Sequence, residues 1–218
     1  ANPHSWLLTA DSLHAQALAI YHQRGQKMIR KYRPGEVGVW HDLAHKSVFL
    51  LGGFALENAI KAFLVYENPG WVANGRLGKR IRSHSLTKLQ SRSTLIPYQK
   101  KYKYVLEGFE EGLESWARYP CALTVASTKE EAVLQDRIWA GYLRLMSAYG
   151  NKMIRLLAGG WEGPYGGYGR LKSGSINKRV NGPAGICTPL HRIYKITGRF
   201  LQPLVSFMWH WVADWPPK

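Results

Sequence analysis

The residues best suited to chemistry gather in a short basic segment that ends near a histidine. Four cationic side chains precede His84 within a few residues: Arg76, Lys79, Arg80 and Arg82. Guanidinium and ammonium groups bind phosphate oxygens, and an imidazole can transfer a proton near neutral pH. Ser83 is expected to cap a short helix, whose free amides would face the same anion. The pattern suits a phosphate site with a ligand-facing His84, although a solvated loop beside a core-contacting histidine has the same composition.

A second pair of charged residues lies in the most apolar part of the chain. Glu57 and Lys61 are four residues apart with the acid first, which is the favourable order for an ion pair on a helix. On a polar helix such a pair would be exposed and would contribute about 0.3–0.5 kcal/mol. Here the neighbouring residues are apolar, so we expect one or both side chains to lie at the edge of a cleft or to reach a distant partner.

Aromatic and cationic residues also occur together further along the chain. Arg118 and Tyr119 precede Pro120, where they could end a helix or present a ring and a charge to a base and its phosphate. The C-terminal region mixes the two types again: Tyr165, Tyr168, Trp209, Trp211 and Trp215 with Arg170, Lys172, Lys178, Arg179 and Arg192. Single-stranded nucleic acid, a partner protein or a dimer interface would each use such a mixture, and a flexible extension could carry it too.

The overall charge favours a phosphate-bearing partner. The chain has 218 residues with 30 Lys and Arg against 14 Asp and Glu, a formal net charge of +16. A field of this size attracts polyanions, and nucleic acid, nucleotides and anionic membranes are the candidates. No apolar stretch of the N-terminus or the tail resembles a signal peptide or spans a bilayer, so we expect a soluble, cytoplasmic protein with no membrane partner.

No pattern for a cofactor or a metal is visible. Two cysteines, Cys121 and Cys187, make no zinc or redox motif, and the eight histidines are scattered. Neither a dinucleotide-binding glycine motif nor a P-loop occurs. We therefore expect no cofactor and no metal.

The spacing of apolar residues predicts an all-α fold. Helices are expected over residues 4–23, 42–67, 97–117 and 128–157, with a short helix after Ser83 and the second one buried at the centre. Gly52 and Gly53 in that central helix would allow close approach of a neighbouring helix. Thr128 and Glu131 form a capping box for the last helix.

The chain changes character after Ala158. Residues 159–185 are rich in glycine, and the region from Gly150 to Lys218 has ten Lys or Arg against two acidic residues. A helix around 190–212 is expected, interrupted by Gly198 and Pro203. We therefore divide the chain into a helical bundle, residues 1–158, and a basic, flexible or partly helical C-terminal appendage, residues 159–218.

Three of the motifs described above occur in an order that is typical of a known protein family. The central helix carries Glu57 and Lys61, the short helix His84, and the following long helix ends with Arg118 and Tyr119. This order resembles the HEPN family, small helical bundles found in prokaryotic toxins, defence proteins and nucleotidyltransferase partners. The resemblance covers about residues 4–158.

The resemblance implies an up-and-down bundle of four to five helices, often a homodimer, that binds nucleotide or RNA. It also suggests that Glu57 pairs with Arg118, because these motifs occur together in the family. Many members are metal-independent ribonucleases whose catalytic Arg and His are four to six residues apart. Seven, three and one residues separate Arg76, Arg80 and Arg82 from His84, so the implied function is a non-catalytic binding module of a toxin–antitoxin or defence-type system.

Two alternatives stay open. One is a ribonuclease toxin in which His84 acts with Arg80 or Arg76 as catalytic residues, without a metal. The other is an interaction subunit that docks a nucleotidyltransferase or another protein through the Trp-rich tail.

Overall fold

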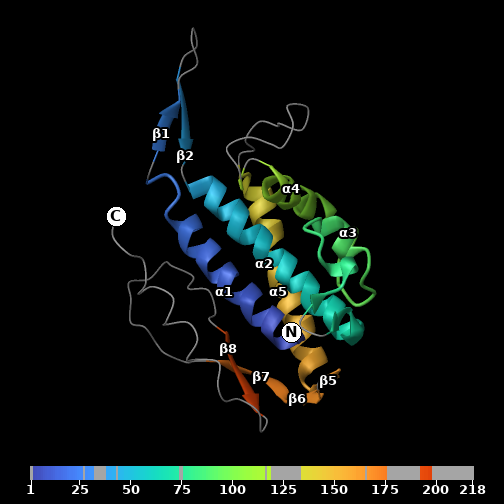
Figure 1. Ribbon diagram of the computed structural model, residues 1–218. Helices are drawn as coiled ribbons and strands as arrows, with labels where there is room; N and C mark the ends of the chain where they lie inside the picture. The colour runs from blue at the N-terminus through green and yellow to red at the C-terminus, as the bar shows by residue number, and fades with distance from the viewer. Residues whose placement is uncertain are drawn as a thin grey trace, which may run out of the picture.

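The computed structural model describes residues 2–26, 28–31, 38–42, 44–73, 76–115, 117–118, 134–164, 166–175 and 192–197. The described chain is mostly helical, which confirms the helical character predicted from the sequence (Figure 1). Its α-helices are α1 (Pro3–His22), α2 (Ala44–Glu67), α3 (Leu86–Gln90), α4 (Lys103–Glu114) and α5 (Asp136–Leu157).

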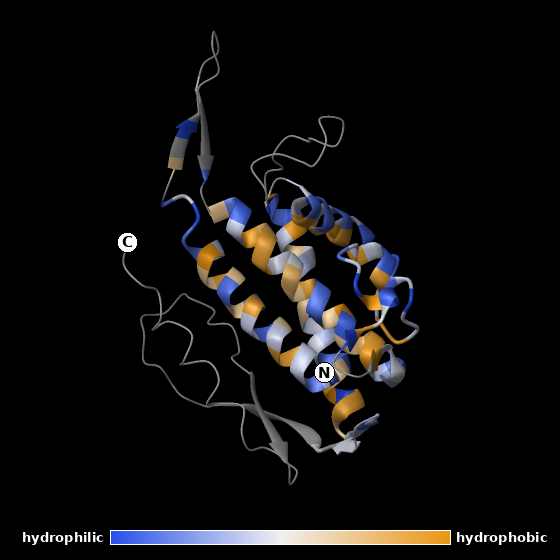
Figure 2. Ribbon diagram, in the orientation of Figure 1, coloured by the Kyte–Doolittle hydropathy of each residue, from blue (hydrophilic) through white to orange (hydrophobic). Residues whose placement is uncertain are grey.

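Helix α2 is the central helix, as its apolar sequence predicts. Helix α1 lies along one side of it, and α3, α4 and α5 contact its other faces. Figure 2 shows hydrophilic residues on the outward side of α4, whose other side packs on α2. By length and composition α2 could cross a bilayer, but 78% of its most apolar stretch is buried inside the structure. The core helix of a soluble protein has the same property.

Two glycines set the distance between α2 and α4. A Cβ atom on Gly52 would lie 2.6 Å from the Phe109 ring, and one on Gly53 would lie 2.7 Å from Cγ of Leu113. Real Cβ atoms do not approach carbon this closely, so a larger residue at either position would force the Phe109 or Leu113 side chain to shift. The predicted use of Gly52 and Gly53 for close helix approach is confirmed.

A ladder of aromatic rings joins four helices through the core. Tyr21 of α1 stacks on Trp139 of α5 with ring centroids 4.0 Å apart, and Trp139 stacks on Tyr142 at 4.8 Å. Tyr142 then stacks on Phe109 of α4 at 4.9 Å, and Phe109 contacts Phe49 of α2 at 5.1 Å. Aromatic pairs in such offset and tilted arrangements are worth about 0.5–1.5 kcal/mol each beyond the area they bury.

Two helices begin later than their apolar patterns predict. Residues 97–102 are not helical, because Tyr98 has a φ of 59°, and α4 begins only at Lys103. Gln135 is extended and precedes α5, which begins at Asp136 rather than Thr128. Asp136 suits a first helical turn electrostatically and pairs with Arg24, which lies just after α1, at 3.2 Å. The Thr128 and Glu131 capping box lies outside the described residues.

Short antiparallel hairpins connect or follow the helices, and the sequence analysis did not predict them. The pairs are β1 (Met28–Lys31) with β2 (Val39–Asp42), β3 (Val72–Ala73) with β4 (Arg76–Leu77), β5 (Trp161–Gly163) with β6 (Gly166–Tyr168), and β7 (Arg170–Ser175) with β8 (Arg192–Thr197). Two 3₁₀ turns, η1 (Pro69–Trp71) and η2 (Lys79–Ile81), flank β3 and β4.

The region after α5 differs in part from its prediction. The helix expected around 190–212 is wrong at Arg192–Thr197, a strand rich in β-branched and aromatic residues. The rest of that helix and the three tail tryptophans lie outside the described residues. Trp161 is buried, and its indole nitrogen donates to the carbonyl of Tyr66 at 3.4 Å. The segment just after residue 158 therefore packs on α2, while the division at 158 stays a prediction.

Candidate functional site

The Glu57 and Lys61 side chains form an ion pair inside the core. Lys61 Nζ donates to Glu57 Oε1 at 2.6 Å, and both residues are only 4% exposed. Because both groups are buried within apolar α2, each depends on protein partners rather than water for its hydrogen bonds. The Lys61 ammonium also lies 5.6 Å from the ring of Trp6 on α1, a contact the sequence analysis missed.

His84 connects this buried pair to the surface. Its Nδ1 lies 3.0 Å from Glu57 Oε2, and its side chain is 47% exposed. A carboxylate accepts hydrogen bonds, so Nδ1 is the donor here and the proton position on the ring is fixed. No hydrogen bond reaches Nε2 from the described residues, and this nitrogen is the one that a ligand could use. The prediction that Glu57 reaches a distant partner is confirmed for His84.

The predicted pair between Glu57 and Arg118 is wrong. Arg118 lies beyond the end of α4 with an exposed side chain. Both oxygens of the Glu57 carboxylate are occupied by Lys61 and His84 instead. Tyr119 lies outside the described residues, so its predicted role in ligand binding stays a prediction.

The basic segment before His84 presents its charges to solvent. The side chains of Arg76, Lys79, Arg80 and Arg82 are all exposed. Ile81 is completely buried between them and anchors the segment to the core.

Two of these arginines are already oriented by protein contacts. Arg82 Nε donates to the carbonyl of Leu77 at 2.7 Å, and the Arg80 guanidinium lies 5.5 Å from the ring of Trp71. The carbonyl of Arg80 accepts from Arg92. These contacts hold the segment in place while its charges remain available to an anion.

The expected phosphate site at the amides of the short helix is closed. Ser85, not Ser83, caps α3, and its hydroxyl accepts from the amide of Lys88. The amide and hydroxyl of Thr87 both donate to Glu110 of α4, each at 2.8 Å. A carboxylate therefore already fills the position that a phosphate would take. The sequence analysis missed Glu110, because nothing in the α4 pattern marks it as a partner of a distant helix.

The candidate site thus combines one oriented imidazole edge with the exposed cations of the segment that precedes it. Such a surface can bind phosphate oxygens and hydrogen-bond one group of a ligand, and its histidine could also transfer a proton. Among the described residues, no three His, Cys, Asp or Glu side chains gather in a way that could hold a metal ion.

Comparisons with known proteins identify no relative of this chain. No family model, no curated protein and no solved structure matches the chain.

Proposed function

We propose that this chain is a nucleotide- or RNA-binding module of the HEPN type, with a four- to five-helix bundle that holds a phosphate-bearing ligand without cleaving it. The observation that carries the proposal is the half-exposed ring of His84, which buried Glu57 fixes and which the exposed cations of residues 76–82 precede in the sequence. Burying an ion pair to fix one surface ring costs desolvation. That cost is understandable where the ring meets a ligand.

The contacts of the arginines favour binding over cleavage. A metal-independent ribonuclease needs a cation at the phosphate beside its histidine. Arg80 lies over Trp71, and Arg82 is bonded to the Leu77 carbonyl. Neither contact directs the guanidinium to His84. The net charge of +16 supplies the long-range attraction for a polyanion.

One observation favours ribonuclease activity as a second candidate. The Glu57–His84 contact at 3.0 Å is the arrangement by which a carboxylate orients a histidine for proton transfer. In that case Nε2 would act on the 2′-hydroxyl or the leaving oxygen, and a cation from the basic segment would have to move to the phosphate.

One experiment separates the two candidates. Purified protein is incubated with labelled tRNA and total RNA in EDTA, and binding and cleavage are resolved on the same samples. We expect salt-sensitive binding with intact RNA, and weaker binding by the variants His84→Ala and Arg80→Ala. Lys88→Ala, which removes an exposed cation of α3, is the matched control. Cleavage that disappears in His84→Ala would replace the binding module with a ribonuclease.

A further inference from the structure

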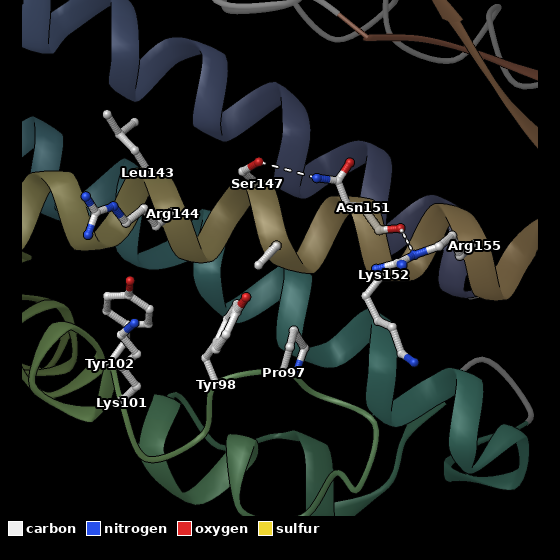
Figure 3. Close-up of a pocket in the computed structure, with 11 residues that line it drawn as sticks. Pro97, Tyr98, Lys101, Tyr102, Leu143, Arg144, Ser147, Asn151, Lys152 and Arg155 are labelled. Carbon is white, nitrogen blue, oxygen red and sulfur yellow. Dashed lines mark hydrogen bonds between the residues drawn. The ribbon is translucent and has the colours of Figure 1, made fainter.

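An open groove lies between the segment 97–102 and the outer face of α5. Its volume is about 550 Å³, and two tyrosine rings and four cations line it: Tyr98, Tyr102, Lys101, Arg144, Lys152 and Arg155. Figure 3 shows Tyr98 and Tyr102 on the loop side, facing the row of side chains from α5. No Asp or Glu is among the lining residues. The groove shares no residue with the His84 site.

Helix periodicity places the α5 cations in one row. Arg144, Ser147, Asn151 and Arg155 follow steps of three and four along the helix, while Tyr142, Leu145 and Tyr149 face the core: these three are fully buried. From Arg144 to Arg155 the helix rises about 16 Å, at about 1.5 Å per residue. The row is therefore longer than a single phosphate group and could follow a backbone that carries several.

The four cations that line the groove keep their charge within the described part of the chain. Within the described ranges, no carboxylate pairs with Arg144, Lys101, Lys152 or Arg155. Lys101 lies 5.5 Å from the ring of Tyr102, and Arg155 Nε donates to the carbonyl of Asn151 at 3.3 Å. Both contacts orient a cation and leave its charge in place.

Tyr98 is held in a conformation that bulky residues rarely adopt. Its φ is 59°, in the left-handed region, and its side chain is 55% exposed. The ring meets Tyr102 edge-on at 5.9 Å. Strained backbone persists where the surrounding structure determines it, and such positions cluster at ligand sites. An exposed ring beside a row of cations is the combination on which unpaired bases stack while their phosphates are neutralised.

We infer that this groove binds single-stranded nucleic acid, with a base on Tyr98 and the phosphates along Arg144, Lys152 and Arg155. The inference extends the proposed function to a second surface, and it does not depend on the His84 site. A duplex would not fit the same description, because its paired bases offer no free face to Tyr98. The aromatic rings also distinguish the groove from a site for phosphate alone.

The test measures binding of a fluorescein-labelled mixed-sequence 12-mer RNA to the full chain in EDTA. Tyr98→Gly removes the ring but keeps the left-handed backbone accessible, so the loop should fold as before. We expect it to weaken binding about tenfold, as loss of one stacked base does. Arg144→Glu should weaken binding by a similar factor, whereas Lys88→Glu, the same charge change on α3, should weaken it less than about threefold.

The salt dependence of RNA binding separates phosphate contact by Arg144 from a purely structural role, because a structural role would leave the salt slope unchanged. Removing one phosphate-contacting cation with Arg144→Ala should reduce the slope of log K against log salt by about 0.7 for a single strand. Lys88→Ala should leave the slope unchanged. An unlabelled duplex of the same sequence should compete less well than the unlabelled single strand.

Three results would overturn the groove as a nucleic-acid site. The first is that Tyr98→Gly and Arg144→Glu bind the RNA no more weakly than Lys88→Glu does. The second is that the duplex competes as strongly as the single strand. The third is that Arg144→Ala has the same salt slope as the wild type. If the groove variants bind normally while His84→Ala and Arg80→Ala lose binding, the groove fails and the proposed function stands. If only the groove variants lose binding, the RNA-binding role belongs to the groove and the His84 proposal fails.

Discussion

At the residue scale, Lys61, Glu57 and His84 form a chain of contacts from the core to the surface. The exposed fraction of the side chain rises from 4% at Lys61 to 47% at His84. A carboxylate in this position must be satisfied on both oxygens, since burial without partners would be costly. The buried pair therefore positions the ring, and the ring is the part that can meet a ligand.

Removing the Glu57 carboxylate should destabilise the protein strongly. Glu57→Ala leaves the Lys61 ammonium buried without its acceptor, so we expect the free energy of unfolding to fall by about 3–5 kcal/mol. Urea denaturation followed by circular dichroism measures the change. The matched control is Glu107→Ala, which breaks the exposed pair between Lys103 and Glu107 and should cost about 0.5 kcal/mol or less.

A double variant identifies the cause of that loss. Glu57→Ala combined with Lys61→Met removes the unpaired charge as well, and it should be more stable than Glu57→Ala alone. A Glu57→Ala protein as stable as the wild type would show that the pair does not hold α2 in the way its burial suggests.

At the element scale, the contact between α2 and α4 depends on absent side chains. Gly52 and Gly53 of α2 let Phe109 and Leu113 of α4 approach the α2 backbone. In the same way, Gly112 of α4 lets Phe49 of α2 approach the α4 backbone. Each glycine lowers the intrinsic helix propensity by about 1 kcal/mol relative to alanine. The close packing that glycine allows must outweigh this loss.

Gly53→Ala should therefore destabilise the protein, although alanine has a higher helix propensity than glycine. The new Cβ would lie within about 3 Å of three Leu113 side-chain carbons, and we expect a net loss of about 1–2 kcal/mol despite the better propensity. Gly108→Ala in α4 is the control, because its Cβ would meet only Ile138, at an ordinary distance of 3.6 Å. That change should stabilise by up to about 1 kcal/mol. Equal effects of both changes in thermal or urea unfolding would contradict the packing argument.

At the scale of the whole molecule, local patterns predicted the helices up to α5, though not where α4 and α5 begin, and they did not predict the contacts between distant residues. The helical character of α1 and the burial of most of α2 could be predicted, because both follow from the spacing of apolar residues. The partner of Glu57 is a histidine 27 residues away, and the amides of α3 are filled from α4. No spacing along one chain encodes either contact. The groove could not be predicted either, because its two walls are distant in the sequence and become neighbours only when segment 97–102 turns at Tyr98.

One buried and one partly buried histidine make the stability of the whole molecule sensitive to acid. Burial lowers the pKa of His14 on α1 from 6.5 to about 4, and burial also lowers the pKa of His4 at the start of the same helix. The Nδ1 of His14 shares a 2.8 Å hydrogen bond with the hydroxyl of Tyr142 on α5. Protonating either ring therefore opposes the packing of α1 on the rest of the protein.

The sign of the pH dependence follows from these directions. Between pH 6.5 and about 4 the unfolded chain binds a proton at His14 that the folded protein does not, so stability is complete above pH 6.5 and falls as the pH drops. For His14 the loss should be on the order of 2–3 kcal/mol at pH 4. Urea unfolding at pH 7, 5.5 and 4 measures it, and His14→Gln should flatten the dependence relative to the wild type. His22→Gln, at the exposed end of α1, should follow the wild-type curve. Parallel curves for wild type and His14→Gln would show that the His14 ring does not link stability to pH.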